Sequence, residues 1–508
     1  MSLAVLNSYV LQGTYALPIH VEVHSGPGLP AFNIVGLPDA GVRESRDRVR
    51  SAIHNSGFAF PLGRITVNLA PANIRKVASQ LDLPIAIGIL MASGQVNVSH
   101  NTPSININRF ILAGELSLTG ALLPLHTALI IALNVSSNSK SIANIILPRI
   151  GASVAASVPG VSVLQASSLH EVAFYLSGLK TLDSAKPKRF SNAQPNKYEC
   201  LSEVKGQHAA KRVLEICASG GHSLLMLGTP GSGKSMLANR FSSILPELSR
   251  TESLEVAAIA SLSEQNAVYP SHMPPFRAPH HTITVAGLIG GGITPRPGEV
   301  SKAHNGVLFL DELPEFSRDS LEALREPLEN GIIEIARNAY SVSYQSRFIL
   351  LAAMNPCPCG WLGHIKKVCK CTPDQITRYA GKLSGPLSDR IDIHLQVSPN
   401  TSMLMNDANG ESSKAIRQRV IACRTAQRNR QGCLNAYLTV DGLMSYCELD
   451  SLCQALLDKA MDKWGLSSRA IHRAIKVART IADMSDRKSI NESDISEALQ
   501  YRSISLVS

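Results

Sequence analysis

A glycine-rich loop between an apolar run and a helix-like segment has the clearest chemical character in the sequence. The loop consists of Gly228, Thr229, Pro230, Gly231, Ser232, Gly233, Lys234 and Ser235. Residues 224–227 before it and 236–245 after it give this GxxxxGKS pattern the strand–loop–helix setting of a phosphate-binding loop. Backbone N–H groups would converge on a phosphate, Lys234 would supply a positive charge, and the Ser235 hydroxyl would bind Mg²⁺. A fortuitous glycine-rich turn is the alternative.

Two carboxylates follow another apolar run, residues 307–310. A run of this kind is typical of a central strand of a parallel sheet, whose carboxyl end meets the ligand. Asp311 is then expected to hold the Mg²⁺ shell and Glu312 to orient and polarise an attacking water. This pair favours hydrolysis of the nucleotide over binding alone. An exposed acidic pair is the alternative if the motif stands in isolation.

Two further polar residues have the right setting to act on a γ-phosphate. Asn355 follows the apolar run 348–353, so its amide could position the same water; by itself it would be a capping residue. Arg390 lies in a short turn and could reach the γ-phosphate of a neighbouring subunit as an arginine finger. A surface ion pair is the simpler interpretation of Arg390.

Four cysteines fall within fifteen residues, namely Cys357, Cys359, Cys369 and Cys371. These two CxC pairs supply enough thiolates for one tetrahedral Zn²⁺ with bonds of about 2.3 Å, although the spacing is tighter than that of a CxxC knuckle. His364 could replace one sulfur. The alternative is four reduced cysteines that pack a loop.

The elements that must position these residues divide the chain into four segments. Residues 1–180 alternate β-branched runs with helix-like segments, which predicts an α+β domain. Residues 181–197 are polar and punctuated by proline, as in a linker. Residues 198–397 alternate strands and helices, as expected of a nucleotide-binding α/β sheet. Residues 398–508 have only helical periodicity and predict a helical C-terminal domain.

Particular elements follow from the same patterns. Strands are expected at 19–23, 65–69 and 145–147, and a helix is expected at 41–55. In the C-terminal part, helical segments are expected at 411–430 and 450–508. Asn491 and Asp494 have the character of helix-start residues, and another helix is expected at 470–484.

Composition places the chain among folded proteins. It has 508 residues, of which 44% are hydrophobic and 17% charged, so a mostly disordered chain and a single small module are excluded. Ten cysteines over this length are too sparse for a disulfide scaffold. The longest apolar stretches, 83–92 and 128–135, are shorter than the ~18 residues of a membrane span. We therefore expect a cytoplasmic protein without a membrane partner.

The charge balance favours a polyanionic partner. Lys and Arg exceed Asp and Glu by a formal +10, which would suit nucleic acid or acidic lipid and is also compatible with diffuse solubilising charge. A dense arginine run lies at Arg417, Arg419, Arg424, Arg428 and Arg430. Such runs usually form solvated faces or ion pairs, and the lack of interleaved aromatics argues against base stacking. Contact with DNA would therefore be made to phosphates, independent of sequence and sensitive to salt.

Five further strings give the sequence a family resemblance. They lie at residues 32–39, 82–86, 277–282, 355–360 and 478–483 and read FNIVGLPD, DLPIA, RAPHHT, NPCPCG and ARTIAD. With the phosphate-binding loop they make the chain resemble, essentially end to end, the ComM/YifB family of magnesium-chelatase-like AAA+ ATPases. The fold implied is an α/β multidomain chain with a Lon-protease-like α+β domain, a central AAA+ P-loop NTPase domain and a C-terminal helical lid.

The resemblance implies an activity and a set of partners. Members of the family resemble hexameric DNA helicases that use ATP and Mg²⁺ to promote branch migration when DNA is integrated during natural transformation and homologous recombination. The implied partners are single-stranded and branched DNA, other copies of the chain, and recombination proteins. The implied roles are Walker A for Lys234 and Ser235, Walker B for Asp311 and Glu312, sensor 1 for Asn355, arginine finger for Arg390, and sensor 2 for Arg469 or, failing that, Arg473.

The resemblance also implies two elements that project into a central pore. Residues 258–297 match a helix-2 insert, with Arg277 and Arg296 as candidate DNA contacts. Residues 331–347 match a hairpin before sensor 1, with Arg337 near its turn as a third candidate. Arg337 could instead pair with Glu334 on the hairpin surface.

The Lon-like resemblance raises protease activity as an alternative. Alignment with the family's serine loop places Gln80 at the nucleophile position and Leu129 where the catalytic lysine belongs, and neither side chain supports that chemistry. Ser79 lies one residue away from the nucleophile position. We therefore expect residues 1–180 to form a degenerate, non-proteolytic domain. Chelatase-like remodelling of a protein partner is a further alternative that shares the ATPase site.

Overall fold

The computed structural model describes most of the chain. The described residues are 3–73, 76, 79–97, 106–138, 143–187, 199–263, 268–292, 295–337, 340–364, 366–398 and 410–502. They form two compact units. The first comprises Met1–Ser191, Ser253–Ser271 and Ala336–Ser343; the second comprises Asn192–Glu252, His272–Ile335 and Tyr344–Ser508.

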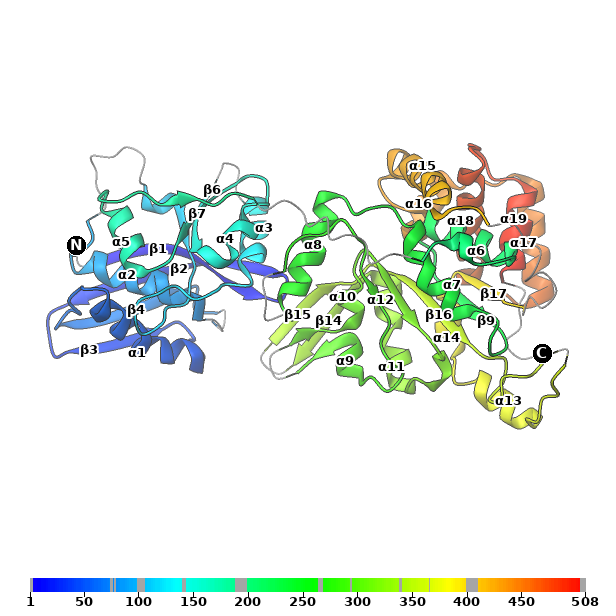
Figure 1. The fold of residues 1–508 in the computed structure, drawn as a ribbon, viewed down its shortest axis with the longest axis horizontal. Coiled ribbons are helices and arrows are strands. Elements are labelled where there is room, and N and C mark those ends of the chain that lie inside the picture. The colour runs from blue at the N-terminus through cyan, green and yellow to red at the C-terminus, as the bar shows by residue number, and fades with distance from the viewer. Residues whose placement is uncertain are drawn as a thin grey trace. The chain divides into compact units, whose positions relative to one another are not determined.

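The first unit is built on a mixed eight-stranded sheet (Figure 1). Its order is β3-β4-β2-β1-β5-β6-β7-β8, from β1 (Leu3–Gln12), β2 (Tyr15–Gly26), β3 (Ala31–Val35), β4 (Arg64–Ala70), β5 (Phe110–Leu112), β6 (Ala143–Pro148), β7 (Val161–Ala166) and β8 (Asp183–Ser184). The predicted strands at 19–23, 65–69 and 145–147 lie within β2, β4 and β6. Strand β8 pairs with β7, so this sheet continues into the segment predicted as a linker. Residues 188–197 of that segment lie outside the described residues.

Helices cover this sheet and close its core. They are α1 (Ala40–Asn55), α2 (Asp82–Ala92), α3 (Ala128–Asn138), α4 (Arg149–Ala155) and α5 (Leu169–Leu176), with short 3-10 turns at Ser79–Leu81 and Ile107–Arg109. The predicted helix at 41–55 is α1. Helix α2 is buried along almost its whole length because it is apolar on all sides, as a helix inside a core must be. This confirms an α+β architecture for the N-terminal part.

The second unit contains a five-stranded parallel sheet. Its order is β10-β13-β16-β9-β17, from β9 (Leu224–Leu227), β10 (Phe276–Arg277), β13 (Val307–Leu310), β16 (Ile349–Met354) and β17 (Ile393–Gln396). The apolar runs predicted as strands before the glycine-rich loop, Asp311 and Asn355 are β9, β13 and β16. Parallel strands buried on both faces read as continuous apolar runs, which is why the sequence predicted them.

Helices connect and flank the parallel sheet. They are α6 (His208–Gly220), α7 (Lys234–Phe241), α9 (Val285–Ile289), α10 (Glu299–Lys302), α11 (Arg318–Ala323), α12 (Arg325–Asn330), α13 (Pro373–Ala380) and α14 (Gly385–Ser388), with 3-10 turns at Leu201–Glu203, Ser242–Ile244 and Leu313–Glu315. Helix α8 (Arg250–Ser261) belongs to the first unit from Ser253 on. The remaining strands form two two-stranded ribbons, β11 (Gly290–Gly291) with β12 (Arg296–Pro297) and β14 (Ile332–Arg337) with β15 (Tyr340–Gln345). The first ribbon belongs to the second unit, whereas Ala336–Ser343 of the other ribbon is assigned to the first unit. The second ribbon is the hairpin predicted at 331–347.

The predicted insert at 258–297 is not one continuous element. Residues 276–277 form β10, the edge strand of the parallel sheet, which pairs with β13. The short ribbon β11–β12 lies between α9 and α10 in the segment after β10. Strand β10 was not predicted, because a two-residue strand leaves no apolar run in the sequence, and the match of residues 258–297 to a helix-2 insert stays a prediction.

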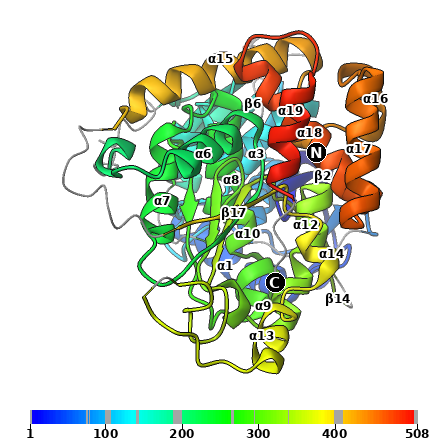
Figure 2. The ribbon, with the colours of Figure 1, turned by 90° about the vertical axis from the view of Figure 1, so that its right-hand side faces the viewer.

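The C-terminal helices pack into the same core as the parallel sheet. They are α15 (Ser413–Gln431), α16 (Val440–Tyr446), α17 (Ser451–Trp464), α18 (Ser468–Met484) and α19 (Glu492–Gln500), with a 3-10 turn at Asn435–Tyr437. Figure 2 shows α15 and α18 beside α6, and one hydrophobic cluster joins these helices to β9. Asn491 and Asp494 form the capping box of α19, as predicted. Throughout the described residues, every helix is too short or too polar to cross a membrane.

Candidate nucleotide-binding site

The glycine-rich loop connects β9 to α7 and curls around the Lys234 side chain. Gly231 and Gly233 have φ values of 79° and 90°, in the left-handed region that favours glycine. The buried Lys234 ammonium donates to the carbonyl oxygen of Gly228 at 2.6 Å and to that of Thr229 at 3.1 Å. Helix α7 begins at Lys234, two residues before the predicted start, because the left-handed Gly233 ends the loop.

The other predicted nucleotide-binding side chains converge on this lysine. Lys234 Nζ also donates to Asn355 Oδ1 at 3.2 Å, and Ser235 Oγ donates to Asp311 Oδ2 at 2.7 Å. They meet because β9, β13 and β16 are parallel neighbours whose carboxyl ends lie at one edge of the sheet. Burial lowers the pKa of Lys234, while the carboxylates of Asp311 and Glu312 act in the opposite direction.

Two buried hydroxyls test whether this loop fits a phosphate. Thr229 and Ser232 are buried, and their side-chain oxygens have no hydrogen-bond partner among the described residues. Buried polar atoms are nearly always paired, so these hydroxyls are available to a polar ligand. Next to them, the partners of the Lys234 ammonium in the described part of the chain are the loop's own carbonyls and Asn355. The donor set therefore fits phosphate oxygens, with Ser235 and Asp311 as oxygen ligands for Mg²⁺.

A histidine that sequence reasoning missed lies beside Glu312. The Nδ1 atom of His281 is 3.6 Å from Glu312 Oε2, and its ring centroid is 4.1 Å from that of His280. Glu312 itself has a left-handed backbone, with φ of 52°. The histidine comes near Glu312 because β10 pairs in parallel with β13, and the two-residue strand β10 left no signal in the sequence that could have shown this. The string RAPHHT had served only as a mark of family resemblance.

Arg390 and Arg469 meet each other, away from this lysine. Arg390 Nη2 lies 2.5 Å from Glu329 Oε2, and Arg469 Nη2 lies 2.8 Å from Glu329 Oε1. Partial burial acts to raise the pKa of Glu329. The hydrogen bond and charge of Arg390, together with the charge of Arg469, outweigh this effect and lower that pKa. Arg473 instead pairs with Asp392 at 2.8 Å. Both residues line a cavity of about 350 Å³ that Glu329 and Arg390 also line.

Sheet topology explains this separation. Arg390 lies just before β17, whose first residue Ile393 is in register with Leu224, the first residue of β9. The glycine-rich loop follows the last residue of β9. Arg390 is therefore about one strand length, ~13 Å for four residues, from the loop along the strand direction. The structure thus brings Lys234, Ser235, Asp311, Glu312 and Asn355 together and leaves the two arginines at the opposite edge.

The sequence is similar to those of known proteins along nearly its whole length. Three family models match, described as "Magnesium chelatase, subunit ChlI" over residues 200–405, "Subunit ChlI of Mg-chelatase" over 21–150 and "Magnesium chelatase, subunit ChlI C-terminal" over 410–502. The protein YifB of Escherichia coli K12 is 43% identical over 509 residues, covering 99% of this chain and 98% of YifB. The competence protein ComM of Haemophilus influenzae is 42% identical over 512 residues, with coverage of 99% and 98%. The chain belongs to the ComM/YifB family. A magnesium-chelatase 67 kDa subunit of Heliobacterium mobile matches only 32% of the chain, at 25% identity.

The cysteines of this ComM/YifB chain come together directly after Asn355. The four ligand atoms of Cys357, Cys359, Cys369 and Cys371 all lie within 4.8 Å of one another. The Sγ atom of Cys357 is 3.4 Å from that of Cys359 and 3.6 Å from that of Cys369. Sulfurs at about 2.3 Å from one Zn²⁺ would be about 3.8 Å apart, so the set fits the ion. His364 is not in this group, because its Nδ1 accepts the backbone N–H of Lys366 and of Lys367.

The cysteine loop also touches the glycine-rich loop. Gly360 has φ of 82°, and a Cβ atom placed there would lie 2.6 Å from Pro230 Cγ. Only glycine allows this approach. The cysteine cluster is therefore in a position to support both Asn355 and the phosphate-binding loop.

The candidate DNA contacts have different settings. Arg277 Nε donates to Glu299 Oε2 at 2.6 Å, so it is held in an ion pair, and Arg296 is exposed on β12. Arg337 ends β14, and its side chain and residues 338–339 lie outside what the structure describes.

The arginine run on α15 is mostly engaged within the second unit. Arg419 binds Glu215 at 2.6 Å, Arg430 binds Asp483 at 2.6 Å, and Arg417 donates to the Ser243 carbonyl at 3.0 Å. Arg419 and Arg430 bear out the ion-pair interpretation of the run, whereas Arg417 binds a backbone carbonyl. Arg424 and Arg428 line a cavity of the second unit.

The N-terminal positions expected at a Lon-type active site have structural roles. Gln80 is buried and donates to the Tyr9 carbonyl at 2.6 Å, and Leu129 is buried in the core. Ser79 Oγ donates to Glu115 Oε2 at 2.5 Å. The nearest lysine in sequence, Lys76, donates to the carbonyl of Pro71. The hydrogen-bond partner of Ser79 is thus a carboxylate, and that of Lys76 is a backbone carbonyl.

Proposed function

We propose that the chain is an AAA+ ATPase that uses ATP hydrolysis to move DNA junctions. The convergence of Lys234, Ser235, Asp311, Glu312 and Asn355 at one sheet edge carries the ATPase part of the proposal. The DNA part rests on the formal charge of +10, the likeness to a relative named as a competence protein, and the hairpin β14–β15. The hairpin runs directly into β16, at whose end Asn355 lies, so a change at Asn355 can move the hairpin.

Each residue at the sheet edge would have one task in hydrolysis. Lys234 would exchange the loop carbonyls for phosphate oxygens, and Ser235 and Asp311 would hold Mg²⁺. The ion would neutralise charge on the β- and γ-phosphates. Glu312 would accept a proton from the attacking water or orient it, and Asn355 would fix its position.

A second copy of the chain would complete this site. Arg390 and Arg469 lie about a strand length from their own phosphate loop, so they would act on ATP bound to a neighbour. The homohexameric ring of the resemblance provides such a neighbour at every site. In the ring, Glu329 would hold both arginines until a γ-phosphate competes for them.

We assign the N-terminal part to a Lon-like domain that does not cleave peptides. Buried Gln80 and Leu129 at the positions of the Lon nucleophile and lysine support this assignment. Labelling of Ser79 by a fluorophosphonate would contradict it. The central and C-terminal parts would be the AAA+ core and its lid.

Remodelling of a protein partner is the competing function, because the matching family models describe magnesium chelatase subunits. The two functions share the ATPase site and differ in substrate. Steady-state hydrolysis with single-stranded DNA, a three-way junction or an unfolded protein distinguishes them. We expect DNA to stimulate hydrolysis; stimulation by unfolded protein alone would favour remodelling.

We further propose that the four cysteines bind one Zn²⁺. Purified protein is expected to contain about one equivalent of zinc by mass spectrometry, and the double variant Cys369→Ser/Cys371→Ser should contain less than about a tenth of that. The matched control is Cys433→Ser, which removes a thiol outside the cluster. Equal zinc in the double variant and the control would contradict the assignment.

His281 is expected to restrain Glu312. Replacing it with Ala removes the imidazole beside the carboxylate, which is 56% exposed. The contact is an ion pair when the imidazole is protonated, and one this exposed is worth at most about 1 kcal/mol, so hydrolysis without DNA should rise by up to about fivefold and the stimulation by DNA should fall. His280→Ala is the control, because His280 bonds to Thr282 and not to Glu312. An unchanged ratio of rates with and without DNA would exclude the restraint.

Arg337 is proposed to hold a DNA phosphate. Arg337→Ala should leave assembly and basal hydrolysis unchanged, weaken junction unwinding, and lower the slope of log K against log salt by about one. The slope is measured by anisotropy of a labelled oligonucleotide. The same slope in wild type and variant would shift the contact to Arg277 and Arg296.

A further inference from the structure

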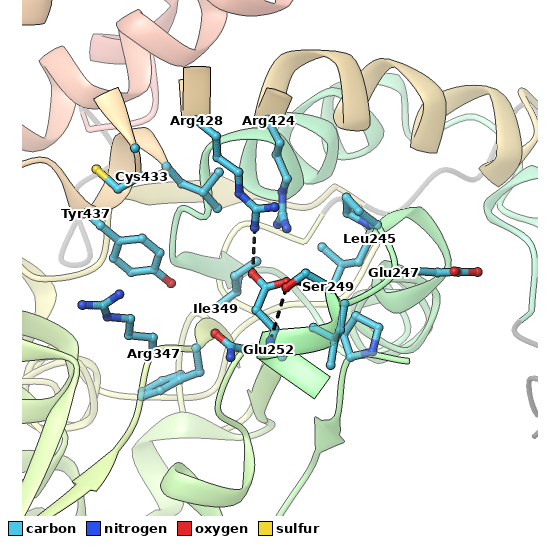
Figure 3. A pocket seen from close by; sticks show the side chains of 18 residues that line it. Leu245, Glu247, Ser249, Glu252, Arg347, Ile349, Arg424, Arg428, Cys433 and Tyr437 are labelled. Atoms are coloured by element: carbon cyan, nitrogen blue, oxygen red, sulfur yellow. Dashed lines mark hydrogen bonds and ion pairs between the residues drawn. The ribbon is translucent and has the colours of Figure 1, made fainter. Parts of the chain in front are cut away.

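A second polar cavity lies at the edge of the parallel sheet where the strands begin. Its volume is about 250 Å³ (Figure 3). Gly306 and Phe348, which precede β13 and β16, line it, whereas the nucleotide-binding residues follow these strands. Residues 245–249, helix α15 and the segment after α15 that contains Tyr437 also line it. The cavity is therefore separate from the nucleotide site and lies within one unit.

Three arginines face this cavity. Arg424 and Arg428 are four residues apart on α15 and so lie on one face of the helix, while Arg347 enters from the segment before β16 (Figure 3). Arg428 Nη2 pairs with Glu252 Oε1 at 2.8 Å. The other acidic lining residue, Glu247, is exposed and its side chain points away (Figure 3). Of the three guanidinium groups, that of Arg428 is the one that has a carboxylate partner among the lining residues.

Two of the three guanidinium groups keep free hydrogen-bond donors. Arg424 Nε donates to the Ala218 carbonyl at 2.7 Å, and its two Nη atoms have no acceptor within the described ranges. Burial lowers the pKa of Arg424 to about 10, and the charge of Arg428 acts in the same direction. The Arg347 side chain likewise has no hydrogen bond or ion pair to any described residue. Its backbone is held in place, because the Arg347 N–H donates to His304 Nδ1 at 3.1 Å. Arg424 and Arg428 carry like charges that act on each other, which an anion in the cavity would offset.

We propose that this cavity binds a phosphate or diphosphate group. Guanidinium groups present paired N–H donors that match phosphate oxygens, and the Tyr437 hydroxyl at the rim adds a neutral donor. The volume is below the roughly 300 Å³ at which pockets for whole small molecules begin, so the cavity suits the charged group alone. The group would come from a free nucleotide or diphosphate, or from the backbone of a nucleic acid strand.

Such an anion would join two parts of the second unit. Arg347 leads into β16, which ends before Asn355, and Arg424 and Arg428 belong to α15 in the C-terminal helices. A phosphate held by both would fix α15 against the start of that strand. This proposal does not depend on ATP hydrolysis or on DNA movement.

Pyrophosphate is the probe for the site. In full-length Lys234→Ala protein, which weakens the phosphate-binding loop, calorimetric titration should detect pyrophosphate binding. Adding Arg347→Gln should raise the Kd by about tenfold or more, because a charge-assisted hydrogen bond contributes about 1.5–3 kcal/mol. Arg347 is exposed, so its replacement should leave folding intact, as thermal unfolding checks. Arg318→Gln, which removes an exposed arginine outside the cavity, is the matched control.

A labelled single-stranded oligonucleotide distinguishes the two sources of phosphate. If the group belongs to a strand, Arg347→Gln should also lower the salt slope of oligonucleotide binding by about one, and pyrophosphate should compete. If it belongs to a small molecule, oligonucleotide binding should be unchanged while pyrophosphate binding is lost. Equal pyrophosphate affinity in Lys234→Ala with and without Arg347→Gln would overturn the proposal, whatever the outcome for hydrolysis.

Discussion

Glu312→Gln is expected to reduce the steady-state rate of ATP hydrolysis by about 10²–10⁴-fold, since an amide cannot accept a proton from water. Binding of ATP should persist, because Lys234, Ser235 and Asp311 keep their positions around the phosphate loop. Release of inorganic phosphate measures the first effect. Titration with a fluorescent ATP analogue measures the second.

Glu315→Gln is the matched control for this prediction. Glu315 lies three residues further on and pairs with Lys382 at 3.5 Å, so its replacement removes the same charge close to the site. We expect its hydrolysis rate to stay within about twofold of wild type, as for most surface changes. Wild-type hydrolysis by Glu312→Gln would remove the assignment of Glu312 as the residue that activates water.

Arg390→Ala is expected to reduce hydrolysis by about 10³-fold, the lower range for loss of an arginine finger. Arg390 lies with Glu329 and Arg469 at the sheet edge opposite its own phosphate loop. We therefore expect it to act on the ATP of a neighbouring chain. A mixture of Arg390→Ala and Lys234→Ala chains should regain activity, because some interfaces then pair an intact loop with an intact arginine. Rates are compared across mixing ratios at constant total protein.

The control for the mixing experiment is Arg378→Ala, which removes an exposed arginine on α13 and should hydrolyse ATP at the wild-type rate. Full activity of Arg390→Ala alone would rule out a role for Arg390 in hydrolysis. Inactivity in every mixture would contradict action on a neighbour's ATP, provided that the mixed chains assemble as the wild type does.

The sequence predicted the nucleotide-binding edge because its determinants are local. Continuous apolar runs identified β9, β13 and β16, and the residues that follow these strands, namely the glycine-rich loop with Lys234, Asp311 and Asn355, were therefore expected at one edge. Within that loop, Gly231 and Gly233 have a left-handed backbone. The cysteines are also close in sequence, and the prediction that they form one group is confirmed.

The remaining features depend on contacts between distant parts of the chain. Arg390 and Arg469 share Glu329, which is 61 and 140 residues away from them, and no local pattern indicates that carboxylate. The two-residue strand β10 was missed for lack of an apolar run. The cavity arginines Arg347 and Arg424 likewise became neighbours only through the fold.

The most direct test of ATP-driven DNA movement is a strand-displacement assay on a labelled three-way junction without sequence barriers. Wild-type protein with ATP and Mg²⁺ is expected to convert the junction to products, whereas Glu312→Gln, or wild type without ATP, should leave it intact. The contradictory result would be a junction that wild-type protein leaves intact with ATP. In that case DNA would not change the rate of ATP hydrolysis, and an unfolded protein would increase it.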